Sequence, residues 1–223
     1  MKSSKKGRET PSSIQGILKR GFDILLSGSG LILSLPVWLL VSVAIVAEDG
    51  PPVFFRQSRW GKGGRPFSVL KFRTMWRGSE KEQSIQASHL DPRITRVGRI
   101  LRACGMDELP QLWNIFKGNM SFVGPRPLPI NEIQSYESEK GIPDEAVPGF
   151  MERLAVRPGL TGMAQIFADR DIIRARKFRY DLFYIRRQNL WLDIRLIAIS
   201  FYISFLGRWE IRGSKFKQRH AGN

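Results

Sequence analysis

Cysteine and histidine are almost missing from this sequence. The single cysteine, Cys104, excludes an internal disulfide framework and a cysteine-based zinc cluster. The two histidines, His89 and His220, lie far apart along the chain and offer no metal-binding pair. Any catalytic chemistry must therefore depend on carboxylates, lysine, arginine or hydroxyl groups.

Acidic residues are scarce relative to basic ones. Lysine and arginine number 36 against 20 aspartates and glutamates, which gives a formal net charge of +16. This imbalance indicates a polyanionic partner, and nucleic acid, an anionic membrane surface and phosphorylated substrates all fit it. The 223 residues are enough for one domain with a core, so we expect one catalytic unit with appendages.

Charge is absent from residues 24–47, a run of 24 apolar and small residues. A straight helix of that length would extend about 36 Å, which is enough to cross a bilayer. A cleaved signal peptide fits poorly, because the run is too long and residues 48–52 do not form a small-residue cleavage site. We expect the segment to remain in the mature protein.

Pro36 lies at the middle of this apolar run. A proline removes one helical hydrogen bond and clashes with the preceding turn, which predicts a kink or a break. Each half would then extend about 18 Å, close to the thickness of one leaflet. Lysines and arginines flank the run on both sides, as cytoplasmic flanks do. A re-entrant helix and an ordinary proline-kinked spanning helix both remain open, while a buried core helix fits the length less well.

The remaining pattern predicts an α+β chain in four parts. A basic tail and juxtamembrane segment occupies residues 1–20, the membrane helix residues 21–49, a cytoplasmic domain residues 50–210, and a basic tail residues 211–223. Residues 52–60 and 67–73 read as two strands joined by a glycine-containing turn, which predicts a β-hairpin. Residues 77–90 are polar and predict a loop.

Helical spacing predicts four further helices. They cover residues 95–103, 107–117, 170–187 and 190–206, and the second is expected to begin with Asp107 as its cap and to stop at Gly118. The last is apolar and carries Trp191, Tyr202 and Trp209, which favours a helix lying in the membrane interface. A packed core helix is the alternative reading.

Residues 99–127 contain the most informative pattern. Asp107 and Glu108 stand side by side before a predicted helix, where the helix dipole favours ionised acids and bound phosphates. An ionised carboxylate there can act as a nucleophile or as a ligand for Mg²⁺. Arg99 and Arg102 share a helix face, and Arg126 lies between two prolines that restrict its backbone. Acids and fixed arginines together are typical of phosphoryl transfer.

Each of these features has a plainer interpretation when taken alone. An Asp-Glu pair before a helix is usually a cap, two arginines on one face are usually solvated, and a Gly-Pro-Arg-Pro segment is often only a turn. The combination is much more specific than its parts.

Seven motifs occur in order over residues 18–206: KRGFD (19–23), KFRTM (71–75), DPRITRVGR (91–99), the segment 107–127, RPGLTG (157–162), YDLFY (180–184) and LWLD (190–193). In this order they resemble the bacterial sugar transferases, which are monotopic polyprenyl-phosphate phosphoglycosyl transferases. The resemblance covers nearly the whole chain.

The resemblance implies a re-entrant membrane helix, a mostly helical cytoplasmic domain with interfacial helices, and a location at the bacterial inner membrane. It further implies Mg²⁺ as cofactor, a UDP-sugar donor, and polyprenyl (undecaprenyl) phosphate as acceptor. Asp107 matches the nucleophile and Glu108 the metal-binding or supporting acid of the dyad. The positions that match substrate-binding or phosphate-binding residues are Arg102, Arg126, Arg99, Lys71, Arg73, Arg157 and Asp181.

Two departures from the family pattern stand out. Ser34 and Pro36 are separated by a leucine at the expected helix break, where many relatives place serine and proline side by side. Cys104, Gly105 and Met106 precede the dyad, where relatives more often have a small hydroxyl residue and an apolar one.

Two other classes of function compete with the enzyme. Charge alone suggests a membrane-tethered nucleic-acid-binding protein, but the sequence contains no recognisable nucleic-acid-binding fold. In a non-catalytic scaffold, the Asp107-Glu108 pair would only cap a helix. The sequence does not identify the sugar or the carrier length, and it leaves open whether the chain forms a homo-oligomer.

Overall fold

The computed structural model describes residues 13–79, 91–130, 144–169 and 172–206. Several predicted features lie outside the described residues. They are the first twelve residues, most of the predicted 77–90 loop, Trp209 and the predicted basic tail at 211–223.

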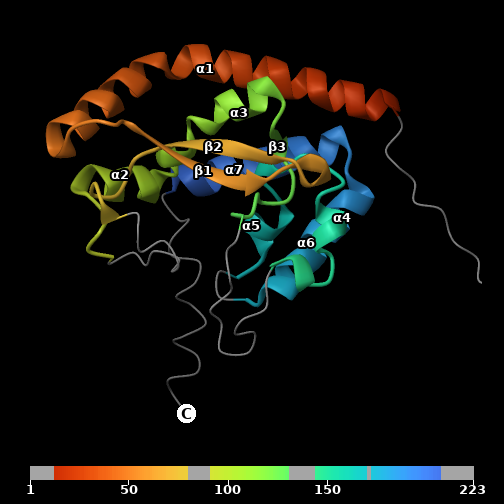
Figure 1. The fold of residues 1–223 in the computed structure, drawn as a ribbon. Coiled ribbons are helices and arrows are strands. Elements are labelled where there is room, and N and C mark those ends of the chain that lie inside the picture. Colours follow the sequence, from red (N-terminus) through yellow and green to blue (C-terminus); the bar gives the residue numbers. More distant parts are fainter. Residues whose placement is uncertain (1–12, 80–90, 131–143, 170–171, 207–223) are drawn as a thin grey trace, which may run out of the picture.

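The apolar run belongs to one long helix, α1 (Ser13–Asp49), which Figure 1 shows arching along one side of the molecule above α3 and the hairpin. The helix starts earlier than the predicted residue 21, so the basic residues Lys19 and Arg20 are part of it. It continues through Pro36, so the expected disturbance takes the form of a curved helix without an interruption. By length and composition, α1 could cross a membrane, and only 6% of its most apolar window is buried.

The predicted hairpin is confirmed. Strand β1 (Phe54–Trp60) pairs antiparallel with β2 (Pro66–Phe72), and the turn between them, η1 (Lys62–Gly64), places Gly63 at a φ of 67°. At the open end of the hairpin, the rings of Phe54 and Phe72 pack against Trp38 of α1, with centroids 5.5 to 5.7 Å apart. The hairpin is therefore fixed to the second half of α1.

Three short helical elements follow one another around the acidic pair. Helix α2 (Arg96–Cys104) is capped by the hydroxyl of Thr95, and it is followed by the 3₁₀ turn η3 (Met106–Glu108) and by α3 (Gln111–Lys117). The predicted stop at Gly118 is confirmed. The prediction that Asp107 caps the helix is wrong: Asp107 lies inside η3, and no side chain caps η3 or α3. Its carboxylate is therefore not used by the helix.

A second, parallel pair of strands was not predicted. Strand β3 (Ser121–Val123) pairs with β4 (Gly159–Thr161), and glycines bring the two backbones together. A Cβ atom on Gly159 would lie 2.1 Å from the amide nitrogen of Gly124, and a Cβ on Gly124 would lie 2.4 Å from the carbonyl oxygen of Arg157. The GPRP and RPGLTG motifs are thus held against each other through their backbones.

The C-terminal part is helical. It comprises η4 (Asp144–Ala146), α4 (Phe150–Arg153), α5 (Met163–Phe167), α6 (Arg174–Arg187) and α7 (Leu190–Phe205). The last two confirm the predicted helices within the described residues. The core lies between β2, α3, β3 and α7 and includes Val69, Ile115, Val123 and Leu196. Together with the hairpin, this confirms an α+β chain.

Polar contacts anchor the first turns of α1 to this core. The Lys19 ammonium donates to the Asp193 carboxylate (2.5 Å), the Tyr184 hydroxyl (3.2 Å) and the Val123 carbonyl (3.1 Å). A few residues on, the buried Asp23 carboxylate accepts hydrogen bonds from the Ser121 hydroxyl and the Phe122 amide, both at 3.1 Å. The KRGFD, YDLFY and LWLD motifs are therefore in contact with one another at this end of α1.

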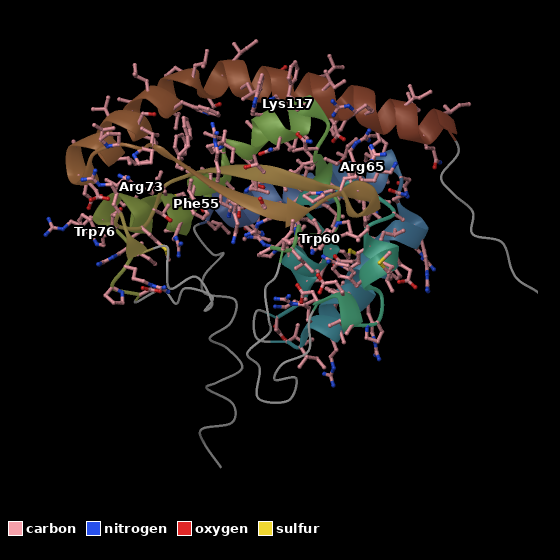
Figure 2. The ribbon with its side chains drawn as sticks, in the orientation of Figure 1. Phe55, Trp60, Arg65, Arg73, Trp76 and Lys117 are labelled. Atoms are coloured by element: carbon pink, nitrogen blue, oxygen red, sulfur yellow. The ribbon has the colours of Figure 1, made fainter. Side chains whose placement is uncertain are left out.

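The last turn of α1 is anchored to the same body. Glu48 accepts hydrogen bonds from the backbone amides of Arg96 (2.7 Å) and Val97 (3.0 Å), which lie at the start of α2. The Asp49 carboxylate lies 3.3 Å from the guanidinium of Arg73, which also donates to the Gly50 carbonyl. Figure 2 shows Arg73 beneath this end of α1. Both ends of the apolar helix are thus bound to one polar domain.

Candidate active site

The acidic dyad lies where η3 meets the hairpin. Asp107 and Glu108 belong to η3, and Lys71 reaches them from β2. The Lys71 ammonium is 2.5 Å from Glu108 Oε1 and 3.9 Å from Asp107 Oδ2. Arg126 approaches the same Glu108 oxygen to 2.9 Å. The structure therefore brings together four of the predicted site residues, from three separate segments of the chain.

The two carboxylates have different environments. Burial by itself would raise the pKa of Glu108, but the charges of Arg126 and Lys71 and their hydrogen bonds outweigh burial and hold this pKa well below its usual range. Burial raises the pKa of Asp107; Lys71 opposes that rise and the Glu108 charge adds to it. Paired titratable groups whose pKa values are pushed apart are typical of acid and nucleophile assignments in enzymes. Glu108 is ionised and hydrogen-bonded by two cations, whereas the Asp107 carboxylate accepts no hydrogen bond from either of them.

Arg102 lies close enough to the dyad to act on it through its charge. It is one of the cations that lower the pKa of Asp107, and its Nε donates to the hydroxyl of Thr74 at 2.9 Å. Close packing holds this region together, because a Cβ on Gly98 would lie 2.2 Å from the Thr74 carbonyl oxygen. Arg99, predicted on the same helix face, is exposed and is not among the charges that act most strongly on Asp107.

The backbone of Arg126 is held from two sides. Arg153 donates to the Arg126 carbonyl at 2.8 Å while forming a 2.7 Å ion pair with Asp181, and both side chains of that pair are buried. Arg59 of β1 donates to the Pro127 carbonyl at 2.6 Å. Arg126 therefore projects from a fixed segment, although its side chain is 46% exposed.

Three other predicted binding residues lie apart from the dyad. Arg73 binds the last turn of α1, Arg157 donates to the Gly118 carbonyl at the end of α3 (3.0 Å), and Asp181 pairs with Arg153. Each of these side chains holds another part of the protein in place. Ser34 and Pro36, the predicted helix break, lie within α1, where the Ser34 hydroxyl donates to the Leu31 carbonyl at 3.2 Å.

A shallow cleft lies beside Glu108 of the dyad. It is lined by Arg59, Val69, Lys71, Glu108, Gln111, Arg126, Pro127 and Gly159. Its polar lining is predominantly cationic, which suits the diphosphate portion of a substrate.

Sequence reasoning missed three side chains at or behind this cleft. Arg59 and Arg153 hold the Arg126 segment, and no local pattern predicts such long-range contacts. Gln111 lines the cleft, and it follows Glu108 by three residues, the spacing at which side chains align in a 3₁₀-type turn such as the one that joins η3 to α3.

The dyad can contribute to a magnesium site. Mg²⁺ is usually bound by one or two carboxylates together with substrate phosphates and water. Within the described residues no cluster of three or more His, Cys, Asp or Glu side chains could hold a metal ion. Asp107 and Glu108 supply two carboxylates, so the residues fit a metal whose remaining ligands come from the substrate.

Comparisons with known proteins place the chain in a family. Residues 14–207 match the family model described as bacterial sugar transferase. The chain is 38% identical over 202 residues to a UDP-glucose:undecaprenyl-phosphate glucose-1-phosphate transferase of Klebsiella pneumoniae, covering 88% of this chain and 42% of that relative. It is 40% identical over 195 residues to a UDP-N-acetylgalactosamine-undecaprenyl-phosphate N-acetylgalactosaminephosphotransferase of Aeromonas hydrophila, covering 86% of this chain and 44% of that relative.

A shorter relative matches over most of its length. The exopolysaccharide production protein PSS of Rhizobium leguminosarum bv. phaseoli is 38% identical over 187 residues, which cover 81% of this chain and 92% of that protein. By contrast, the chain spans less than half the length of the Klebsiella and Aeromonas relatives. The match over residues 14–207 is nevertheless nearly the whole chain, and the protein belongs to the bacterial sugar transferase family.

Proposed function

We propose that this protein is a phosphoglycosyl transferase that moves a phosphosugar from a UDP-sugar to polyprenyl phosphate, giving polyprenyl-diphosphate-sugar and UMP. The observation that carries the proposal is the unequal dyad: Glu108 is held by Lys71 and Arg126, while Asp107 is left without a hydrogen bond from either. A carboxylate bound by two cations is a poor nucleophile, so attack falls to Asp107. The relatives' names, which contain UDP-sugars and undecaprenyl phosphate, support the substrates.

The reaction has two displacements at one phosphorus atom. An Asp107 oxygen bonds to the phosphorus that carries the sugar, and the bond from this phosphorus to the bridging oxygen breaks, so that UMP leaves with that oxygen. A phosphate oxygen of polyprenyl phosphate then bonds to the same phosphorus, and the bond to Asp107 breaks, which restores the carboxylate. The soluble donor and the lipid acceptor therefore use one site in turn.

The cations around the dyad stabilise the charge that develops on the phosphoryl oxygens. Lys71 and Arg126 already converge on Glu108, and Arg102 acts on Asp107 from α2. In phosphoryl transfer, positioning and charge stabilisation supply most of the catalysis. Mg²⁺, held by Glu108 and Asp107 with substrate phosphates, would neutralise diphosphate charge when bound.

The test of the nucleophile uses the donor alone. Native protein incubated with a UDP-sugar should release UMP and gain the mass of a phosphosugar on the peptide that contains Asp107. Asp107→Asn keeps the shape of the side chain but removes its charge, and this variant should release no UMP when it is incubated with the donor alone. Asp169→Asn, at an exposed aspartate, is the matched control and should behave as native. Absence of an adduct after rapid quenching, with kinetics that require both substrates to bind before UMP leaves, would instead make the dyad a base and metal ligand in a single displacement.

The membrane arrangement forms part of the proposal. Both ends of α1 bind the same polar domain, through Lys19 and Asp23 at one end and Glu48 and Asp49 at the other. A helix that crossed the bilayer would place these ends on opposite sides. We therefore place α1 in one leaflet as a re-entrant helix, with the catalytic domain on the cytoplasmic face of the inner membrane. Exposed apolar residues of α7 such as Phe201 and Phe205 would lie at the same interface.

Cysteine labelling tests this topology. In a Cys104→Ser background, single cysteines replacing Gly16 and Lys62 lie on the two sides of the apolar run, and both positions are exposed. Both should react with a membrane-impermeant reagent only from the cytoplasm. Labelling from opposite faces would show a spanning helix and would leave the proposed chemistry intact.

A further inference from the structure

Arg102 is the cation of the site whose hydrogen-bonding capacity is least used. Three cations act on Asp107 through their charges, and they are Lys71, Arg102 and Arg126. Lys71 and Arg126 each bond Glu108, at 2.5 and 2.9 Å. Arg102 bonds only through its Nε, and within the described part of the chain its two terminal nitrogens have no partner. The four N–H groups on those nitrogens are therefore left for a substrate.

The Nε of Arg102 is held by the hydroxyl of Thr74, which accepts its hydrogen bond at 2.9 Å. Thr74 lies two residues beyond the end of β2 and is only 7% exposed. A threonine side chain is stiff at χ1, so burial leaves this hydroxyl little freedom. A guanidinium is planar, and a bond from Nε to a fixed group therefore restricts where its terminal nitrogens can lie. Thr74 thus sets the direction in which Arg102 presents its remaining donors.

The segment that contains Thr74 also supplies the lysine that binds the dyad. Lys71 lies on β2, three residues before Thr74, and its ammonium bonds Glu108. Arg102 lies on α2, which leads directly into η3 and its two carboxylates. Two side-chain contacts therefore join residues 71–74 to residues 102–108, and each of them involves one cation of the site. A change in the contact between Thr74 and Arg102 would move this guanidinium relative to the dyad.

The attachment of α2 to this segment does not depend on the Thr74 hydroxyl. The backbone amide of Thr95, just before α2, donates to the Thr74 carbonyl oxygen at 3.1 Å. Gly98 packs so closely on the same carbonyl oxygen that a Cβ atom there would lie 2.2 Å from it. These contacts are made by the backbone of Thr74, whereas its hydroxyl bonds the side chain of Arg102. The hydroxyl therefore orients the arginine, while the backbone holds the helix.

We propose that Thr74 is a positioning residue of the transferase, whose hydroxyl fixes the Arg102 guanidinium so that its terminal nitrogens meet the oxygens of the transferred phosphoryl group. The assignment rests on the proposed function, because it takes the phosphorus attacked by Asp107 as the reacting centre. Thr74 itself does not touch the substrate. A guanidinium that is held in place before the donor binds stabilises the developing charge without first having to be ordered.

The test follows UMP release from the donor alone in single turnovers. The donor is whichever of UDP-glucose, UDP-galactose, UDP-N-acetylglucosamine or UDP-N-acetylgalactosamine the native protein converts fastest. The rate constant divided by the half-saturating donor concentration gives the efficiency of the first displacement. Thr74→Val keeps the shape of the side chain and removes the hydroxyl, so it should lower this efficiency about 10-fold, within the scale of coupling between residues in contact. Thr74→Ser keeps the hydroxyl and should stay within about threefold of native.

A double-variant cycle separates the orientation of Arg102 from any other role of Thr74. Arg102→Met should lower the efficiency about 100-fold, because the transferred group loses charge-assisted donors. In the Arg102→Met background, Thr74→Val should change the efficiency less than about twofold, because no guanidinium is left to orient. Thr74→Ala removes the hydroxyl without placing a methyl group beside the guanidinium, and it provides the same comparison should the valine variant fold poorly.

Thr95→Val is the matched control on the same helix. The Thr95 hydroxyl caps α2 by accepting a hydrogen bond from the Gly98 amide at 2.9 Å. Loss of this cap should lower the thermal unfolding midpoint. It should leave UMP release within about threefold of native and have the same effect in the Arg102→Met background. Thr74→Val should show the opposite pattern, with a small change in the midpoint and a large change in UMP release.

The outcomes separate this assignment from the function on which it rests. Equal losses from Thr74→Val in the native and Arg102→Met backgrounds, or native efficiency in both Thr74→Val and Thr74→Ala, would overturn the positioning role and leave the transferase intact. Native efficiency in Arg102→Met would remove this arginine from the site and would overturn the proposal with it. A native protein that releases no UMP from any of the four donors would overturn the proposed function itself.

Discussion

Variants of Asp181 can test whether this residue binds the substrate or supports the site by holding Arg153. Its carboxylate forms a 2.7 Å pair with Arg153, and the two side chains are only 3% and 4% exposed. Arg153 also stacks on Phe178, 4.2 Å from the ring centroid, and donates to the Arg126 carbonyl. Asp181→Asn would leave the buried guanidinium without a counter-charge.

The expected cost follows from that burial. Removing one partner of a buried pair destabilises a protein by about 3–5 kcal/mol, because the remaining charge stays desolvated. Arg153→Met also breaks the pair, and it should cost about 1 kcal/mol more than Asp181→Asn, because the Arg126 carbonyl loses its hydrogen-bond donor as well. In the double variant Arg153→Met with Asp181→Leu, no unpaired charge remains, so its loss of stability should be much smaller than the sum of the two single losses.

The measurement combines unfolding with kinetics in one lipid or detergent system. Denaturant unfolding followed by circular dichroism gives the free energies of native and variant proteins, and UMP release gives kcat and KM well below the unfolding midpoint. The double variant should regain stability without regaining kcat, because Arg126 is still unsupported. Asp181→Asn with native stability and a raised KM for the donor would refute the reasoning and make Asp181 a substrate ligand.

Three further predictions concern the dyad and its support. Arg126→Lys should lower kcat/KM by about 1.5–3 kcal/mol in transition-state stabilisation, because an ammonium cannot reproduce the planar grip of a guanidinium on phosphate, and native activity in this variant would remove Arg126 from the site. In the proposed mechanism Asp107 attacks in its ionised form, and burial raises its pKa, so kcat/KM should fall with decreasing pH at a pH above the ordinary aspartate value of 3.8; a pH–rate profile with no such acid limb would contradict the assignment. Gly159→Ala should cost about 2–3 kcal/mol of folding stability, because its Cβ would overlap the Gly124 backbone, while Gly16→Ala, with open space around it, serves as control in the same thermal unfolding assay.

Local signals in the sequence predicted the local structure well. Two strand-like segments joined by a glycine turn predicted the hairpin, and a basic and an apolar helical segment predicted α6 and α7, because these elements depend on neighbours in the chain. The β3–β4 pair could not be predicted in this way. Its partners Ser121 and Gly159 are far apart in the sequence, and three-residue strands carry almost no periodic signal.

The site was predictable where chemistry defined it and not where packing did. Asp107, Glu108, Lys71 and Arg126 converge as their chemistry required. Arginines and acids in the motifs that resemble the family were also expected at the substrate, yet Arg73 and Asp181 make contacts that join segments of the fold. A charged residue has the same appearance in a sequence whether its partner is a ligand or another part of the chain, and only the tertiary contacts separate the two.

The contact between α1 and α3 fixes the position of the acidic dyad relative to α1. Arg20 of α1 donates to the carbonyls of Ile115 and Phe116 at the end of α3, and Gly30 leaves room for Leu112 nearer its start. Both ends of α3 therefore lie against α1, and the dyad, which directly precedes α3 in the chain, is held at a fixed distance from α1. In the proposed arrangement, with α1 in a single leaflet, this distance is set from one membrane surface only. Access to a lipid phosphate would then be independent of bilayer thickness, and the proposed transferase activity should be equal in thin and thick membranes.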